Sequence, residues 1–193
     1  MPRVPARARR AGRRHEEGLA RDAAVEALRA RPPAPKTGPL TPDGSRRATG
    51  DVDFLVEAHG ADALHEALTR AGYEALHRST DVANYRATAA ILTGVDLLFA
   101  RRPPTLAMLD RASVPEGQAG VPVVDAEGLI GLKLQAIVND PRRRRQDEAD
   151  IVTLLTLRLP SLNLALLEEY FELFDRREDL ARFLAEARRH RSG

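Results

Sequence analysis

Two aspartates, Asp51 and Asp53, open the apolar stretch DVDFLVE at residues 51–57. Aspartate is depleted in β-strands, and a carboxylate inside a protein is costly unless a cation or a positive group meets it. In a strand, residues i and i+2 share a face, so the two carboxylates would lie about 6.6 Å apart at Cα. Val52 and Phe54 then face the core. Mg²⁺ prefers such oxygen ligands, and the pattern therefore indicates a magnesium site.

A third aspartate has the same setting. Asp96 lies in the stretch GVDLLFA at residues 94–100, again as a lone acid in an apolar segment. If the two strands pair, three carboxylates converge, an arrangement that can hold two divalent ions about 3.5–4 Å apart for phosphoryl transfer. The alternative is that these aspartates cap turns at strand ends, where the residue is common. The spacing alone leaves both interpretations open.

The pattern of apolar residues after Gly50 predicts strands first and helices later. This order favours an α+β fold with a small mixed sheet and C-terminal helices. The final segment reads as a helix or helical hairpin with Ser161 as its N-cap. Strands are expected at residues 51–57, 83–88, 94–100 and near 121–125, and helices at 61–73 (with Gly72 as the stop), 104–112, 126–138, 144–157 and 161–189.

The first part of the chain has a different composition. Residues 1–47 hold 11 arginines, one lysine and seven prolines against five acidic residues. Proline removes a backbone donor and fixes φ, so this segment is a poor candidate for a central strand or long helix. We expect three parts: a poorly ordered basic arm at 1–42, a core at 43–157, and a helical segment at 158–193. The arm is either a solvated tail or a contact for nucleic acid.

Composition excludes several classes of protein. The chain has no cysteine, so it can form neither a disulfide framework nor a thiolate metal site. No apolar run approaches the roughly 18 residues that a membrane span needs. We therefore expect a soluble, cytoplasmic protein that does not use a membrane partner.

The ordered series of motifs resembles a known family. Residues 44–56, GSRRATGDVDFLV, are followed by GVDLLF, by GLIGLKLQAIVND and by RRQDEADIVTLL. This series resembles the nucleotidyltransferase superfamily with the DNA polymerase β-like fold. It is closest to the small bacterial branch of AbiE-type abortive-infection toxins and minimal nucleotidyltransferases. The matching positions are Gly44, Arg47, Thr49, Asp51, Asp53, Asp96, Lys133, Asp147 and Asp150.

The resemblance implies a Mg²⁺-dependent (or Mn²⁺-dependent) enzyme. It would transfer a nucleoside monophosphate from a nucleoside triphosphate to an acceptor hydroxyl and release pyrophosphate. The acceptor class, whether RNA, protein or small molecule, stays open, and a cognate antitoxin or toxin partner is implied. Asp51, Asp53 and Asp96 would be the catalytic metal ligands, with Asp96 also activating the hydroxyl. The implied nucleotide-binding residues are Lys133, Arg47, Thr49, Gly44 and Ser45.

Three alternatives stay open. Lys133 is either a phosphate contact or a lysine at the edge of a core helix whose ammonium reaches solvent. Asp147 and Asp150 either contact nucleotide or stabilise a helix start. Finally, Pro39 and Pro42 exclude a helix at the place where family members bind the triphosphate with a glycine-led helix N-terminus. A catalytically silent, partner-binding module is therefore the alternative to an enzyme.

Overall fold

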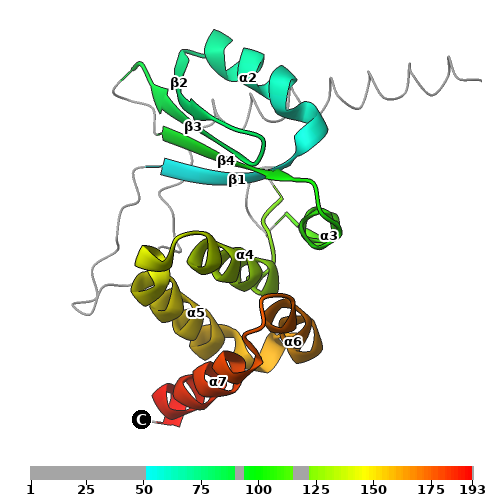
Figure 1. Ribbon diagram of the computed structural model, residues 1–193, viewed down its shortest axis with the longest axis vertical. Coiled ribbons are helices and arrows are strands. Elements are labelled where there is room, and N and C mark those ends of the chain that lie inside the picture. The colour runs from blue at the N-terminus through cyan, green and yellow to red at the C-terminus, as the bar shows by residue number, and fades with distance from the viewer. Residues whose placement is uncertain (1–50, 90–93, 115–121, 193) are drawn as a thin grey trace, which may run out of the picture. The chain divides into compact units, whose positions relative to one another are not determined.

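A computed structural model describes residues 51–89, 94–114 and 122–192 of the 193-residue chain (Figure 1). The chain divides into two compact units between Val123 and Val124, and each is described by itself. The basic arm expected at the N-terminus lies outside the described residues. The three-part division expected from the sequence stays a prediction.

A four-stranded mixed sheet forms the first unit, with the strands in the order β1-β4-β3-β2. β1 pairs with β4 in parallel, and the other two pairings are antiparallel. The expected α+β fold with a mixed sheet is thereby confirmed. The strands are β1 (Asp51–Glu57), β2 (Tyr73–Arg78), β3 (Val82–Ala87) and β4 (Gly94–Ala100).

Helix α2 (Ala61–Arg70) covers one face of this sheet (Figure 1). Its Leu68 is fully buried in a cluster with Tyr85, Val95 and Leu97 from β3 and β4. These residues alternate along their strands, as a sheet with one covered face requires. The polar residues between them therefore point to the opposite face.

The chain leaves α2 through a tight turn that needs glycine. Gly72 has φ of +89°, a conformation that L side chains rarely adopt. An added Cβ would also come within 3.3 Å of Thr88 Oγ1. The turn reverses the chain into β2, and a 3₁₀ turn, η1 (Ala58–Gly60), connects β1 to α2. Helix α3 (Pro103–Arg111) follows β4.

The second unit is helical. Its core contains Ile130, Leu134, Ile151, Leu155 and Phe171, all completely buried. Contacts run between α4 and α5, between α4 and α6, and from α7 to both α5 and α6. The elements are α4 (Ala126–Asn139), η2 (Pro141–Arg143), α5 (Arg144–Arg158), η3 (Leu159–Ser161), α6 (Leu164–Leu173) and α7 (Arg177–Ser192).

Three local expectations were wrong. β2 was not expected, and the strand expected near residues 121–125 is a single bridge between Ser113 and Val123. The final segment is a pair of helices, but Asn163 caps the first of them: its side chain accepts a hydrogen bond from Leu166 N–H at 3.2 Å. Ser161 instead ends the 3₁₀ turn before it. Across the described ranges, none of the helices combines the length and apolarity that crossing a bilayer requires.

Candidate functional site

The parallel pairing of β1 with β4 places Asp53 beside Asp96. The two residues are direct register partners, and neighbouring strands lie about 4.8 Å apart. Phe54 and Leu97, the next pair along, turn toward the α2 face, so the aspartates belong to the opposite face. Asp53 is exposed and Asp96 is half-buried. The two carboxylates, which come from neighbouring strands, therefore lie side by side on the same face of the sheet.

Asp51 stands two residues earlier in β1 and pairs with Gly94. The structure describes its backbone but not its side chain. Strand alternation predicts that its carboxylate shares the face of Asp53. Opposite it, Gly94 contributes no side chain that would fill the space on β4.

The other neighbour of Asp96 is Asn84 on β3. These two residues are register partners in the antiparallel pair of β3 and β4. Asn84 Nδ2 donates a hydrogen bond of 2.6 Å to Asp96 Oδ1. Asn84 was not selected from the sequence, although asparagine is depleted in strands and its position inside one was a usable signal.

The row of paired positions continues to the edge strand. His77 on β2 is the register partner of Asn84, next to an irregularity in the pairing of β2 with β3. The same level of the sheet thus carries Asp53, Asp96, Asn84 and His77, one from each strand. This row lies on the face opposite α2, where the alternation of apolar and polar residues places polar side chains.

The donor set at Asp53 and Asp96 fits a hard divalent cation. Carboxylate oxygens are the ligands that Mg²⁺ and Mn²⁺ accept, and Mg²⁺ is commonly bound through one or two carboxylates together with substrate phosphates. Within the described residues, no group of three histidine, cysteine or acidic side chains is arranged to hold a metal ion. Asp51, the third carboxylate expected from the sequence, lies outside that set because its side chain is not described, so its role as a ligand stays a prediction.

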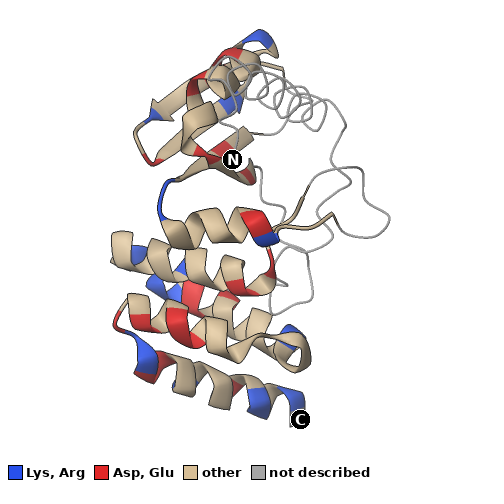
Figure 2. Ribbon diagram, turned by 90° about the vertical axis from the view of Figure 1, so that its right-hand side faces the viewer, with Lys and Arg blue, Asp and Glu red and all other residues tan. Residues whose placement is uncertain are grey.

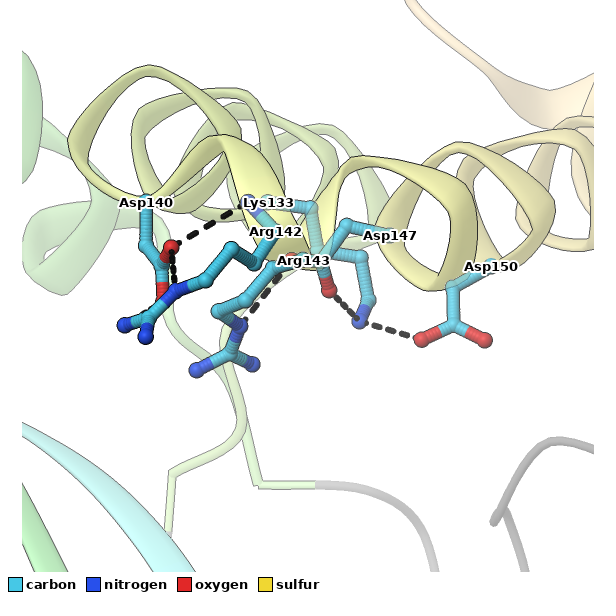
Figure 3. Close-up of polar contacts among 6 residues, drawn as sticks. All are labelled: Lys133, Asp140, Arg142, Arg143, Asp147 and Asp150. Carbon is cyan, nitrogen blue, oxygen red and sulfur yellow. Dashed lines mark hydrogen bonds and ion pairs between the residues drawn. The ribbon is translucent and has the colours of Figure 1, made fainter.

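Lys133 lies in the helical unit and contacts two carboxylates. Its Nζ is 3.2 Å from Asp147 Oδ1 and 2.6 Å from Asp150 Oδ2 (Figure 3). Arg143 Nε reaches the other oxygen of Asp147 at 3.2 Å. Because Asp147 and Asp150 are one turn apart on α5, they present both carboxylates to the same point on α4.

Burial decides what this cluster does locally. The Asp147 side chain is 1% exposed, and a carboxylate so deeply buried requires paired charges. Two cations and two carboxylates leave the cluster with no formal net charge. Its ion pairs join α4 to α5. The nucleotide-binding role expected for Lys133 stays a prediction.

A second ion-pair network joins α5 to α7. Arg176 bridges Glu148 at 2.7 Å and Asp179 at 2.6 Å, and Arg182 contacts both acids as well. Burial raises the pKa of Glu148, but hydrogen bonds from Arg144 and Arg176 outweigh burial and bring the pKa below its ordinary value. Figure 2 shows both signs of charge interspersed along these helices. This network is structural.

The remaining predicted nucleotide-binding residues lie outside the described part of the chain. They are Gly44, Ser45, Arg47 and Thr49. Their expected contact with the triphosphate therefore stays a prediction.

A protein-family model described as "Nucleotidyl transferase AbiEii toxin, Type IV TA system" matches residues 41–192. The match covers more than three quarters of the 193 residues, including every helix and strand described above. No curated protein sequence matches the chain.

Proposed function

The chain belongs to the AbiEii nucleotidyltransferase toxin family, and on that premise we propose that it is a Mg²⁺-dependent enzyme that transfers a nucleoside monophosphate from a nucleoside triphosphate to an acceptor hydroxyl. The observation that carries the proposal is the register pairing of Asp53 with Asp96 on adjacent parallel strands. This pairing supplies two carboxylates at one place on the face of the sheet opposite α2.

Asp53, Asp96 and Asp51 are the residues that would hold the cation. A divalent cation bound to them would neutralise the negative charge of the triphosphate that develops during transfer. Two carboxylates side by side repel each other in the absence of a cation, so the same residues favour cation binding.

In the proposed reaction, the acceptor oxygen forms a bond to the α-phosphorus of the nucleotide. The bond between that phosphorus and the oxygen bridging to the β-phosphate breaks, and pyrophosphate leaves with the bonding electron pair. The carboxylate of Asp96 accepts the proton of the acceptor hydroxyl. Because little covalent chemistry falls to the protein, positioning by β1 and β4 is its main contribution.

The family description also concerns partners. Members are toxins of type IV toxin–antitoxin systems, so membership implies a cognate antitoxin for this chain. For the acceptor we propose the classes that carry a free hydroxyl, namely an RNA end, a protein side chain or a small molecule.

The position of the label in the nucleotide tests the reaction directly. The full chain is incubated with Mg²⁺, cell extract or RNA, and each of the four nucleoside triphosphates labelled at either the α- or the γ-phosphate. We expect incorporation from an α-labelled nucleotide and none from the γ-labelled one. Incorporation of the γ-label alone would identify phosphoryl transfer by a kinase and contradict the proposal.

Variants assign the activity to the site. Asp53→Ala should abolish labelling. Asp62→Asn is the matched control, because Asp62 is an exposed carboxylate of the same unit that lies on α2 and pairs with Arg78 at 2.9 Å. Labelling that survives Asp53→Ala, or that is lost equally in the control, would remove the assignment.

A second candidate function is a catalytically silent module that binds its partner through the same fold. Two observations favour it: Pro39 and Pro42 occupy the segment where the triphosphate-binding helix is expected, and the ammonium of Lys133 is neutralised by two carboxylates. Calorimetric titration with Mg-ATP and Mg-GTP separates the candidates. Micromolar binding supports the enzyme, and absence of binding to both nucleotides supports the silent module.

A further inference from the structure

Asn84 has a position in the sheet that a purely structural residue does not need. It lies at the centre of β3, half-buried, and its side-chain amide donates a hydrogen bond to a carboxylate of the candidate site. We propose that Asn84 is a positioning residue that orients Asp96 for cation binding and for proton acceptance. This inference rests on the proposed function.

The first argument is geometric. Asp96 has a register partner on each side, Asp53 on β1 and Asn84 on β3. The amide of Asn84 donates a hydrogen bond of 2.6 Å to Asp96 Oδ1. This bond fixes the rotation of the carboxylate about its last side-chain bond. The second oxygen is thereby held in one direction, where it can serve a cation or a hydroxyl.

The second argument concerns charge. In the helical unit, the acids Asp147, Asp150 and Glu148 are paired with lysine or arginine, which cancels their charge. The described partner of Asp96 is an amide, which donates a hydrogen bond and carries no charge. Asn84 therefore orients the carboxylate and preserves its negative charge for a cation. An arginine in the same place would compete with that cation.

Groups that hold a metal ligand in orientation usually affect metal affinity strongly. Loss of such a partner typically weakens metal binding or activity about 10–100-fold. A residue that merely stabilises the sheet would instead alter the melting temperature and leave the metal affinity of the folded protein unchanged. The two roles therefore give different measurements.

The test uses Mn²⁺ alone as the probe, with the full chain and electron paramagnetic resonance, because the signal of free Mn²⁺ is lost on binding. Asn84→Leu keeps the approximate shape of the side chain and removes the donor, and Asn84→Ala serves as a second variant if the first fails to fold. Arg86→Ala is the matched control, since Arg86 lies on the same strand and face and bonds Glu74 on β2 at 2.8 Å.

We expect a 10–100-fold weaker Mn²⁺ affinity in the Asn84 variants, an affinity within twofold of wild type in Arg86→Ala, and loss of binding in Asp53→Asn and Asp96→Asn. Asn84 variants that bind Mn²⁺ as wild type does, while the aspartate variants lose it, overturn the role of Asn84 and leave the proposed function standing. Aspartate variants that bind as wild type does, or a wild-type chain that binds no Mn²⁺, overturn both.

Discussion

Lys133 and Asp147 form an ion pair between α4 and α5, with Nζ 3.2 Å from Oδ1 and an Asp147 side chain that is 1% exposed. The α4 helix is otherwise apolar at its centre, where Ile130, Leu134 and Ile137 are buried. Desolvating a charge pair at this place is costly, and removal of one partner leaves the other as an unpaired buried charge. It behaves as a unit with Asp150 and Arg143.

Removing the lysine should destabilise the helical unit. Lys133→Met leaves Asp147 buried with Arg143 alone, so we expect a loss of about 3 kcal/mol in the free energy of unfolding, at the low end of the range for breaking a buried pair. Urea denaturation followed by circular dichroism measures it. A loss below about 1 kcal/mol would show that the pair is not required for folding.

Two further variants define the cause of that loss. Arg142→Ala breaks an exposed pair with Asp140 in the same segment and should not measurably change stability. Asp147→Leu combined with Lys133→Met removes the buried charge itself, so the double variant should recover most of the loss.

The helical unit shows which structural features can be predicted from sequence patterns and which cannot. The apolar periodicity predicted α4 and α5, and the three-residue spacing placed Asp147 and Asp150 on one face of a helix. The charge run at residues 142–145 indicated an arginine partner, and Arg143 pairs with Asp147. The pairing with Lys133 was not predictable, because it depends on how α4 packs against α5. Ser161 and Asn163 are both good N-caps; Ser161 ends the preceding 3₁₀ turn, and the side chain of Asn163 caps α6.

In the sheet, some strands were predictable from the sequence, but an edge strand and the strand register were not. β1 and β4 were predictable because each is a short apolar run with an aspartate near its start. β2 was missed because Tyr73 is its one buried residue; the rest of this edge strand is exposed and leaves no alternation to detect. The pairing of Asp96 with Asn84 depends on register between β3 and β4, and that register is not contained in the local sequence.

Acid should destabilise the network between α5 and α7. Hydrogen bonds from Arg176 and Arg182 outweigh the effect of burial and hold the pKa of Asp179 below its ordinary value of 3.8, and the pKa of Glu148 lies below 4.5. A carboxyl whose pKa is lower in the folded state stabilises the protein above its unfolded pKa, and that stability is lost as pH falls through the folded pKa. We expect the free energy of unfolding to fall steadily from about pH 5 downward.

Glu148→Gln should flatten this dependence, since glutamine does not titrate. The matched control is Glu172→Gln, which removes an exposed carboxyl paired with Arg177 and should leave the pH dependence as in wild type. Denaturation curves at pH 7, 5 and 3.5 compare the three proteins. Equal slopes in Glu148→Gln and wild type would place the acid sensitivity elsewhere.

We expect Glu127 to stabilise the folded protein through a single hydrogen bond. Its buried side chain accepts from the backbone N–H of Asn163 at 2.6 Å, joining the start of α4 to the start of α6. Glu127→Ala leaves that N–H without its partner, so we expect a loss of about 2 kcal/mol in the free energy of unfolding. Glu127→Gln keeps an acceptor oxygen and should lose about 1 kcal/mol. Equal losses in the two variants would point to side-chain packing as the cause.

Cation binding should protect the sheet and leave the helical unit unaffected. A cation that binds only the folded protein stabilises it by mass action, by about 2.7 kcal/mol at 100 times its dissociation constant. Since Asp53 and Asp96 lie on β1 and β4, we expect Mg²⁺ or Mn²⁺ to slow amide hydrogen exchange in residues 51–57 and 94–100. Exchange in α5, α6 and α7 should not change.

The aspartate variants make that expectation specific. Asp53→Asn and Asp96→Asn keep the shape of each side chain and remove the charge, so each should abolish the added protection in β1 and β4. Asp147→Asn should retain it, because Asp147 belongs to the ion pairs of the helical unit. Protection that appears equally in wild type and Asp96→Asn would restrict the cation to β1, because the carboxylate on β4 would then contribute nothing to binding. A site on β1 alone lacks the second strand that positions the acceptor hydroxyl, and the proposed transfer reaction would lose its structural basis.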